Sequence, residues 1–252
     1  MAQGQRIAFV TGAASGLGLS SSERLAAAGY AIVLVDRSDK VLEAAERLRG
    51  EDRVAEGHVA NVTDEAAMTA LVHDITARRG GIDILVNNAG GMALPKGGSV
   101  AIEDLPTDLW TRTVAVNLTA PFVLCRLVFP AMKEKGWGRI INIASRAGRM
   151  AVPDTSVSYA ATKAGLIGMT RIVADQGAKF GITANCIAPG RIATPGGTNA
   201  TDDVLQRSLS RIPAGRLGLA TEVAATIAFL VSDGAAYITG AVIDVNGGAF
   251  MG

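Results

Sequence analysis

The stretch Thr11-Gly12-Ala13-Ala14-Ser15-Gly16-Leu17-Gly18 lies directly between an apolar segment, Ile7–Val10, and a helix that the sequence predicts near residues 17–28. Glycines at such a turn allow the backbone to bend tightly and to approach a pyrophosphate closely. The N-terminus of the following helix offers unpaired N–H groups and the positive end of the helix dipole to that anion. The spacing is G-x-x-x-G-x-G rather than G-x-G-x-x-G, and it lacks the Lys and Ser/Thr of a nucleoside-triphosphate loop. These features predict a dinucleotide-binding turn at the start of an α/β fold.

Short apolar segments alternate with longer amphipathic segments along the rest of the chain. Short, largely apolar runs are typical of strands that are buried on both faces of a sheet. We predict strands at Ile7–Val10, Ala31–Val35, Val54–Val59, Ile82–Val86, Ile140–Ala144, Thr183–Ala188 and Val242–Val245, and helices near 17–28, 39–49, 64–78, 107–134, 159–179 and 221–232. Alternation of this kind, with right-handed crossovers, gives a parallel sheet covered by helices on both faces. We therefore expect one doubly wound, Rossmann-type α/β domain over residues 1–252, with a substrate-loop region at 191–215.

The composition argues against several classes of protein. The 252 residues carry a formal net charge of +1, so no charge imbalance points to nucleic acid or to a membrane surface. We find no signal peptide and no apolar run that is long enough to span a bilayer, and we expect a soluble, cytoplasmic protein. Cys125 and Cys186 show no disulfide spacing, which fits a reducing compartment. His58 and His73 have no Cys/His cluster in the sequence around them, so no metal site is expected.

Two further features belong to the predicted cofactor end. Asp36 ends the second strand, where an acid accepts hydrogen bonds from the adenosine ribose and repels a 2′-phosphate, so NAD is favoured over NADP. Arg37 leaves NADP as an alternative cofactor, because a guanidinium next to Asp36 is suited to binding a 2′-phosphate. The segment Asn87-Asn88-Ala89-Gly90 follows the strand Ile82–Val86. It suits either contact with the cofactor or a simple Asn-rich turn, and the sequence alone favours neither.

Tyr159 and Lys163 are the candidate proton-transfer residues; they lie four residues apart in a predicted helix. Such residues lie on one helix face, one turn apart. An ammonium near a phenol favours the phenolate, so we expect the pKa of Tyr159 to fall below its ordinary value of about 10. A phenol tuned in this way can transfer protons near neutral pH. Ser145, directly after the strand Ile140–Ala144, lies a short way upstream.

In their order these motifs resemble the classical short-chain dehydrogenase/reductase family, and specifically its 3-oxoacyl reductases, over essentially the whole chain. The resemblance rests on TGAASGLG at 11–18, Asp36, Asn87-Asn88-Ala89-Gly90, Asn117, Ser145, Tyr159-x-x-x-Lys163, Pro189-Gly190 and the closing Asp244-Val245-Asn246-Gly247-Gly248. It implies an NAD(P)-dependent oxidoreductase that transfers a hydride between nicotinamide and a carbonyl or secondary alcohol.

The resemblance also implies a role for each catalytic candidate. Tyr159 would be the acid in carbonyl reduction and the base in alcohol oxidation, and Lys163 would lower the pKa of Tyr159 and hold the nicotinamide ribose. Ser145 would hydrogen-bond the substrate oxygen as charge develops on it. Asn117 would distort its helix locally and hold a water that relays protons to the lysine. No metal is implied.

Further cofactor contacts follow from the same resemblance. Pro189-Gly190, Ile192 and Thr194 match the stretch that receives the nicotinamide carboxamide. Asn61-Val62 matches the adenine-contacting pair, usually Asp-Val, and asparagine keeps a carbonyl acceptor there. The predicted cofactor-binding residues are Gly12, Ser15, Gly16, Leu17, Gly18, Asp36, Arg37, Asn61, Val62, Asn88, Ala89, Gly90, Tyr159, Lys163, Pro189, Gly190, Ile192 and Thr194.

Two alternatives accompany the expectation of an NAD-dependent alcohol dehydrogenase or carbonyl reductase. One is an NADPH-dependent 3-oxoacyl-[acyl-carrier-protein] reductase, which requires Arg37 to prevail over Asp36 in choosing the cofactor. The other is a non-catalytic dinucleotide sensor on the same fold. The set Ser145, Tyr159 and Lys163 argues against the sensor, which has no need of acid–base groups.

The expected substrate is a small or medium carbonyl or secondary alcohol of unspecified identity. We expect its pocket to be formed by residues 91–100, 146–156 and 191–215. An apolar wall is predicted from Met92, Leu94, Met150, Val152 and Ile192, and Arg146, Arg149 and Lys96 are candidates for an acidic group or, alternatively, solvent-exposed charges. The resemblance further implies a homotetramer in which helices 107–134 and 159–179 pack against a second subunit.

Overall fold

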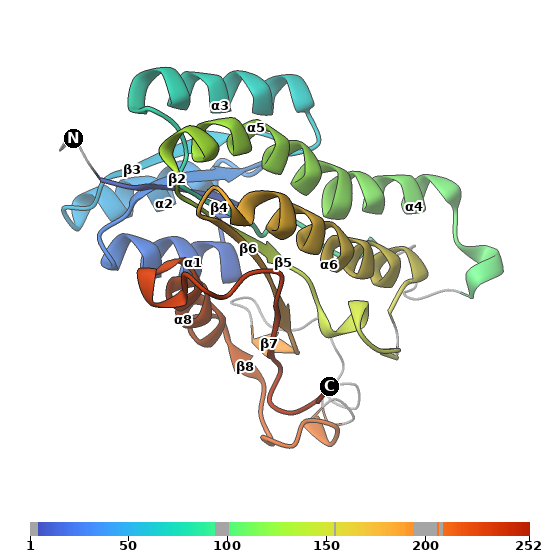
Figure 1. Ribbon diagram of the computed structural model, residues 1–252. Coiled ribbons are helices and arrows are strands. Elements are labelled where there is room, and N and C mark those ends of the chain that lie inside the picture. Colours follow the sequence, from blue (N-terminus) through green and yellow to red (C-terminus); the bar gives the residue numbers. More distant parts are fainter. Residues whose placement is uncertain (1–4, 94–100, 154, 194–205, 207–208) are drawn as a thin grey trace.

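The apolar segments pair as a seven-stranded parallel sheet in the order β3-β2-β1-β4-β5-β6-β9, shown in the computed structural model (Figure 1). The structure describes residues 5–93, 101–153, 155–193, 206 and 209–252. The strands are β1 (Ile7–Thr11), β2 (Ala31–Asp36), β3 (Ala55–Val59), β4 (Ile84–Asn87), β5 (Gly138–Ile143), β6 (Ile182–Pro189) and β9 (Val242–Val245). The direction in which strands are added reverses between β1 and β4, which is where doubly wound folds bind ligands. The expected Rossmann-type architecture is confirmed.

Helices cover both faces of the sheet (Figure 1). On one face, one core cluster joins the strands to α1 (Gly16–Ala27), α2 (Lys40–Gly50) and α8 (Ala220–Val231). On the other, a second cluster joins them to α3 (Glu65–Arg79), α5 (Ala120–Lys135) and α6 (Val157–Ala178). Short 3-10 turns lie at η1 (Ile102–Asp104), η3 (Arg146–Gly148) and η4 (Asp233–Ala235).

Strand β1 shows why these segments are apolar throughout. Ala8 and Val10 point into the first core cluster, whereas Ile7 and Phe9 point into the second. Because successive side chains alternate between the faces and helices cover both, every position of a central strand is buried.

The predicted strands and helices are confirmed with small shifts at their ends. Helix α6 begins at Val157, because Ser156 caps it by accepting a hydrogen bond from the Tyr159 N–H at 3.3 Å. A two-stranded sheet of β7 (Ile192–Ala193) and β8 (Gly218–Leu219) was not predicted. Strands of two residues are too short to show any periodicity.

One expectation about apolar segments is wrong. Helices α4 (Thr107–Val114), η2 (Ala115–Thr119) and α5 run continuously over Thr107–Lys135, which is long and apolar enough to cross a membrane by length and composition. The core helix of a globular domain meets the same criterion, and α5 packs on the sheet within the second core cluster. One flank of α5 is exposed to solvent, however, since Phe122 on this helix is 49% exposed.

Both cysteines lie in the interior. Cys125 is in α5 and Cys186 is in β6, and both are free thiols. Burial raises the pKa of Cys125 to about 12 and that of Cys186 to about 11. Thiolates, which carry the reactivity of cysteine, are therefore suppressed at neutral pH.

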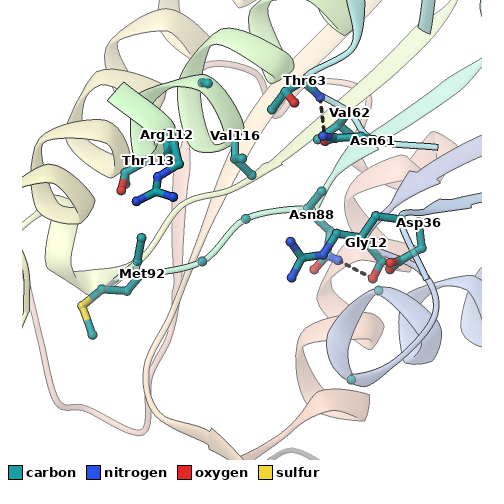
Figure 2. Close-up of a pocket in the computed structure, with 18 of the residues that line it drawn as sticks. Gly12, Asp36, Asn61, Val62, Thr63, Asn88, Met92, Arg112, Thr113 and Val116 are labelled. Atoms are coloured by element: carbon teal, nitrogen blue, oxygen red, sulfur yellow. Dashed lines mark hydrogen bonds between the residues drawn. The ribbon is translucent and has the colours of Figure 1, made fainter. Parts of the chain in front are cut away.

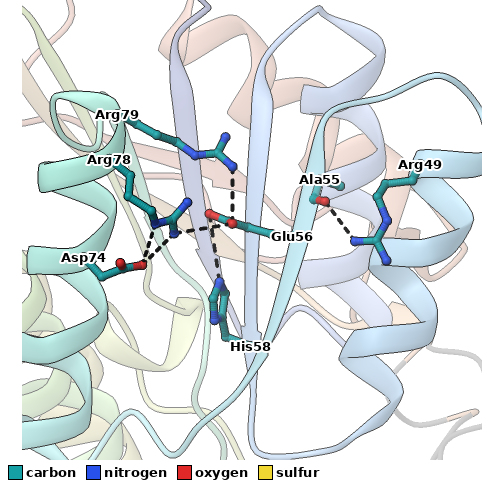
Figure 3. A network of polar contacts seen from close by, with 7 residues as sticks. All are labelled: Arg49, Ala55, Glu56, His58, Asp74, Arg78 and Arg79. Carbon is teal, nitrogen blue, oxygen red and sulfur yellow. Dashed lines mark hydrogen bonds and ion pairs between the residues drawn. The ribbon is translucent and has the colours of Figure 1, made fainter. Parts of the chain in front are cut away.

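A charged network ties the edge strand β3 to helix α3 (Figure 3). The Glu56 carboxylate lies 3.3 Å from Arg79, 3.6 Å from Arg78 and 3.9 Å from Nε2 of His58. Arg78 also pairs with Asp74 at 2.6 Å. The contact with His58 is the main cause that lowers the pKa of Glu56 below 4.5; burial opposes it, and the charges of Arg79 and Arg78 add to the lowering.

This network predicts how stability depends on pH. Because the pKa of Glu56 is lower in the folded than in the unfolded protein, its contribution is present above the unfolded pKa and is lost as pH falls through the folded pKa. We expect Glu56→Gln to reduce the free energy of unfolding by up to about 1 kcal/mol at pH 7. In denaturant titrations the gap to wild type should close under acid conditions, and Glu103→Gln, at an exposed position, should show no such gap. A gap that persists unchanged at low pH would contradict this account.

Candidate active site

The turn between β1 and α1 has glycine where other residues do not fit. Gly12 and Gly16 have φ angles of 65° and 55°, which L side chains rarely adopt. A Cβ on Gly18 would lie 2.1 Å from the carbonyl oxygen of Gly12. Asn88 holds this turn from the neighbouring strand, since its Nδ2 donates to the carbonyl oxygens of Thr11 at 2.8 Å and Gly12 at 3.1 Å.

The same junction is fastened a second time by Thr11. Its Oγ1 accepts from the backbone N–H groups of Asn88 at 3.0 Å and Ala89 at 2.9 Å, and donates to the carbonyl of Val86 at 3.3 Å. Asn88 therefore has a structural task in addition to any contact with a cofactor. Asn87 points the other way and donates to Oδ1 of Asn142 at 2.8 Å.

A pocket of about 970 Å³ opens above this junction (Figure 2). It is bounded by the glycine turn, by the ends of β2, β3 and β4, and by α4 and η2. Its lining includes the predicted residues Gly12, Ser15, Gly16, Leu17, Gly18, Asp36, Arg37, Asn61, Val62, Asn88, Ala89 and Gly90, together with Ala60, Thr63, Gly91, Met92, Ala93, Leu109, Arg112, Thr113, Ala115 and Val116, which were not predicted to bind the cofactor. An elongated site that joins a glycine cradle to an acid at the end of β2 fits a dinucleotide.

Asp36 is held in a fixed orientation at the wall of this pocket. Its Oδ2 accepts from the Ala14 N–H at 3.1 Å and its Oδ1 accepts from the Ser38 N–H at 3.0 Å. The bond from Ala14 connects the acid directly to the glycine turn. Arg37 also lines the pocket, and it is exposed.

Ser145, Tyr159 and Lys163 come together at the ends of β5 and α6. Ser145 follows β5 and caps η3 by accepting from the Ala147 N–H at 3.1 Å, and its hydroxyl is near enough to Tyr159 to influence the pKa of the phenol. Lys163 is only 4% exposed; its Nζ donates to the Ile143 carbonyl at 2.7 Å and lies 5.6 Å from the centre of the Tyr159 ring.

The electrostatics of this group differ from the sequence-based expectation. Burial raises the pKa of Tyr159 above 10, and the neighbouring Ser145 hydroxyl opposes that rise. Burial likewise lowers the pKa of Lys163 to about 8, against the influence of Cys186. The expected lowering of the Tyr159 pKa by Lys163 is therefore not found in the protein without its cofactor, where burial is the largest cause and raises this pKa.

Asn117 occupies a break in the long helix, as expected. It lies in the π-helical segment η2 and is fully buried. Its side chain holds Gly91 in both directions, since Oδ1 accepts from the Gly91 N–H at 2.9 Å and Nδ2 donates to the Gly91 carbonyl at 2.9 Å. Sequence reasoning did not anticipate this clamp on the loop after β4.

Gly90 lies between the pocket and Lys163. A Cβ there would lie 2.7 Å from Oδ1 of Asn117 and 3.4 Å from Nζ of Lys163. The predicted residues Tyr159, Lys163, Pro189, Gly190 and Ile192 do not line the pocket, and Thr194 lies outside the described residues. Gly190 is fixed by its N–H, which donates to Val245 at 2.9 Å.

The predicted substrate wall is only partly described. Met92 lines the pocket and accepts from the Ser156 N–H at 3.3 Å, whereas Leu94 and Lys96 lie outside the described residues. Arg149 is corrected as a candidate for an acidic ligand. It pairs with Asp244, donates to the Gly252 carbonyl at 2.5 Å and stacks 4.5 Å from the Phe250 ring centre.

Sequence reasoning also missed a buried polar chain beneath the site. Asn142 receives the hydrogen bond from Asn87 and donates to Oγ1 of Thr170 at 2.8 Å, and Thr170 contacts Sγ of Cys186 at 3.1 Å. The available signal was an asparagine inside the otherwise apolar Ile140–Ile143 segment, because such a residue needs partners when it is buried.

Comparisons with known proteins agree with this arrangement. A family model described as Enoyl-(Acyl carrier protein) reductase matches residues 12–249. The chain is 40% identical over 246 residues to a 3-oxoacyl-[acyl-carrier-protein] reductase of Escherichia coli (strain K12), covering 98% of both chains. It is 38% identical over 246 residues to a reductase of the same name from Haemophilus influenzae, again covering 98% of both.

Solved structures give the same result. A 3-oxoacyl-[acyl-carrier protein] reductase from Brucella melitensis superposes with a TM-score of 0.93 at 32% identity, covering 99% of this chain and 93% of the other. A structure of such a reductase with bound NAD from the same organism has a TM-score of 0.91 at 32% identity, with the same coverage. With the glycine turn, the pocket and the ordered motifs, these matches show that the chain belongs to the short-chain dehydrogenase/reductase family and is an NAD(P)-dependent oxidoreductase of the 3-oxoacyl-reductase-like type.

Proposed function

We propose that this oxidoreductase transfers a hydride between NAD and a small carbonyl or secondary alcohol, with Ser145, Tyr159 and Lys163 acting at the reacting end. The observation that carries the proposal is the buried Lys163, whose Nζ lies 5.6 Å from the centre of the Tyr159 ring, with the Ser145 hydroxyl acting on the same phenol. A nucleotide-binding protein without chemistry has no use for such a group. When bound, the nicotinamide ring supplies or accepts the hydride.

In this mechanism Tyr159 moves the proton at the substrate oxygen. It donates its phenolic proton during carbonyl reduction and accepts the hydroxyl proton during alcohol oxidation. Ser145 holds the same oxygen by a hydrogen bond that strengthens as negative charge develops there. The two hydroxyls fix the oxygen because one is anchored after β5 and the other on α6.

Lys163 has the donors that the proposed ribose contact needs. An ammonium has three N–H donors, and one of them goes to the Ile143 carbonyl. With a pKa of about 8 the side chain is mainly protonated at pH 7, so its charge favours the phenolate as Tyr159 gives up its proton.

Asn117 is proposed to act through position. Its clamp on Gly91 sets the loop that separates the pocket from Lys163. The water relay implied by the family stays a prediction, and the π-helical break, which interrupts regular helical hydrogen bonding, is compatible with it.

NAD is proposed as the preferred cofactor because of Asp36. A carboxylate fixed by two backbone N–H groups at the pocket wall can accept from ribose hydroxyls, and it repels a 2′-phosphate. Asn61 and Val62 at the same end, and Pro189, Gly190, Ile192 and Thr194 at the nicotinamide end, complete the proposed contacts.

The second candidate is an NADPH-dependent 3-oxoacyl-[acyl-carrier-protein] reductase. It is favoured by the names of the relatives that are 38% and 40% identical to the chain. It requires Arg37 to grip a 2′-phosphate despite Asp36, and an acyl carrier protein as partner. For assembly and location we propose a cytoplasmic homotetramer, with no nucleic-acid or membrane partner.

Replacing the proposed acid–base group should abolish turnover and leave the nucleotide bound. We expect Tyr159→Phe to lower kcat/KM by at least about 100-fold, the scale of general acid–base catalysis, while the Kd for nucleotide changes little. In wild type, kcat/KM for alcohol oxidation should rise with pH as the phenol ionises, and the variant should lack that rise. Nicotinamide absorbance and fluorescence titration measure both quantities. Full turnover in Tyr159→Phe would contradict the assignment.

Cofactor choice can be tested at Asp36 and Arg37. We expect wild type to bind NAD at least about tenfold more tightly than NADP, and Asp36→Asn to reduce that ratio by about tenfold, equivalent to 1.4 kcal/mol. Asparagine retains one oxygen acceptor, so the turn should stay folded. If the second candidate is right, wild type prefers NADPH and Arg37→Gln loses it.

Assembly can be tested through the open flank of α5. We expect light scattering to give about four times the chain mass of 25.8 kDa. Phe122→Glu should weaken the assembly, because it places a charge on an apolar surface that is proposed to be covered. Leu42→Glu, at a residue with 44% exposure on α2, is the matched control and should leave the mass unchanged. A clean wild-type monomer would contradict the proposal.

A further inference from the structure

Two polar contacts join helix α6 to strand β5 at adjacent positions of the strand. Nζ of Lys163 donates to the carbonyl of Ile143 at 2.7 Å, and Nδ2 of Asn142 donates to Oγ1 of Thr170 at 2.8 Å. Lys163 and Thr170 are seven residues apart, so they lie two turns apart on the same face of the helix. Together the two contacts define where α6 lies along the strand and which face it turns toward the sheet.

The hydrogen bonds around Thr170 have a fixed direction. Its Oγ1 donates to the Leu166 carbonyl at 2.7 Å, so its one hydrogen is used within the helix and its lone pairs are left to accept. The amide of Asn142 must therefore turn its NH2 group to Thr170. Its oxygen then faces Asn87, whose Nδ2 donates to it at 2.8 Å. Only one orientation of the Asn142 amide satisfies both partners.

This chain of polar groups is buried, and apolar contacts surround it. Asn87, Asn142 and Thr170 are each no more than 3% exposed. Elsewhere on α6, Ile167 and Ala174 pack against the sheet through apolar contacts, which have no preferred direction. A buried amide N–H that loses its acceptor keeps its full desolvation cost. The polar chain therefore opposes a sliding of α6 that the apolar contacts would tolerate.

The position of α6 matters because the helix meets the turn of Ser145 in close backbone contact. A Cβ on Gly148 in η3 would lie 2.6 Å from the carbonyl carbon of Lys163. Tyr159 and Lys163 are both in α6, whereas Ser145 caps the short helix that contains Gly148. A displacement of α6 would move the phenol and the ammonium relative to the serine hydroxyl.

The other end of the polar chain lies beside the pocket. Asn87 is the last residue of β4, and the next residue, Asn88, lines the pocket and donates to the glycine turn. The two neighbouring side chains thus point to different partners, one to Asn142 and the other to the turn. Strand β4 is in this way bonded both to the glycine turn and, through β5, to α6.

We propose that Asn142 and Thr170 are positioning residues, which hold α6 where its two reacting side chains meet the oxygen bound by Ser145. This rests on the proposed function. Both residues are buried in the core and act through the helix rather than on the substrate. Misplacement of a reacting group by about 1 Å, caused by a substitution far from the chemistry, can cost about 100-fold in rate.

The test compares two substitutions of Thr170 in the intact enzyme. Thr170→Val keeps the shape of the side chain and removes the hydroxyl, whereas Thr170→Ser keeps the hydroxyl. We expect Thr170→Val to lower kcat by about 10- to 100-fold and Thr170→Ser to stay within about threefold of wild type. Ethyl acetoacetate and ethyl 3-hydroxybutyrate, a neutral ketone and its alcohol, serve as substrates, and nicotinamide absorbance reports turnover.

Three further measurements separate position from stability. The Kd for nucleotide should change by less than about threefold in Thr170→Val, because the pocket lining is intact. The pH at which kcat/KM for alcohol oxidation rises should move up by at least about half a unit, since Lys163 no longer supports the phenolate of Tyr159 as well. Crystal structures need no turnover. In Thr170→Val they should show α6 displaced along β5 by about 0.5–1 Å, and in Thr170→Ser they should not.

Thr183→Val is the matched control. Thr183 is a buried threonine on β6, the strand beside β5, and within the described part of the chain its hydroxyl has no hydrogen-bond partner. Replacing it by a methyl group should leave kcat within about twofold of wild type. Thermal unfolding of every variant ensures that the assays are run on folded protein.

A double-mutant cycle tests whether Asn142 and Thr170 act as a pair. Asn142→Ala and Thr170→Val remove the same contact, so the double variant should lose no more kcat than the worse single variant. If Asn142→Ala does not fold, the two Thr170 variants decide the question.

Two results would overturn the inference. One is a Thr170→Val enzyme with the kcat, pH profile and α6 position of wild type, even if it unfolds at a lower temperature. The other is an equal loss in Thr170→Val and Thr170→Ser. Both leave the proposed hydride transfer intact, which fails separately if Tyr159→Phe retains turnover.

Discussion

The tie between β1 and β4 is the constraint on which the rest of the site depends. Asn88 and Thr11 fasten the start of the β4 loop to the glycine turn, at the point where the strand order reverses. Asp36 accepts a hydrogen bond from the Ala14 N–H of the same turn. Asn117 accepts one from the N–H of Gly91, three residues after Asn88. The pocket wall at Asp36 and the loop beside Lys163 are thus both positioned by hydrogen bonds between side chains and backbone groups around this junction. A shift at this junction would displace both.

Much of this was readable from the sequence because it follows from strong local rules. The apolar runs predicted the strands, because both faces of the sheet are covered by helices. The glycine turn could be recognised from its position between a predicted strand and a predicted helix. The paired strands β7 and β8 were not readable, because two residues carry no period. The role of Thr11 in holding the β4 loop could not be predicted either. Its hydrogen-bond partner, Asn88, is 77 residues away, and nothing in the local sequence marks Thr11 as different from other threonines at strand ends.

Tyr159 and Lys163 show a different limit of prediction from sequence. The four-residue spacing predicted that Tyr159 and Lys163 lie one helical turn apart, and both lie in α6. The direction in which the pKa of Tyr159 shifts depends on burial, which sequence spacing does not reveal. Desolvation acts on each group separately, whereas the attraction between them requires both to be charged. Likewise Arg149 and Arg146 are near neighbours in the sequence, yet Arg149 pairs with Asp244 whereas Arg146 is half-buried in η3. Only the fold distinguishes them.

The two interior thiols have a practical consequence for spectroscopy. Cys125 and Cys186 are buried, and burial holds their pKa values at about 12 and about 11. Maleimides and related probes react with thiolates, so the folded protein is a nearly silent background for them. A single cysteine introduced at an exposed position on α2 or α3 would carry a fluorophore or spin label selectively, without removal of either native cysteine. The distance between such a label and a bound nucleotide could then be followed in the otherwise native enzyme.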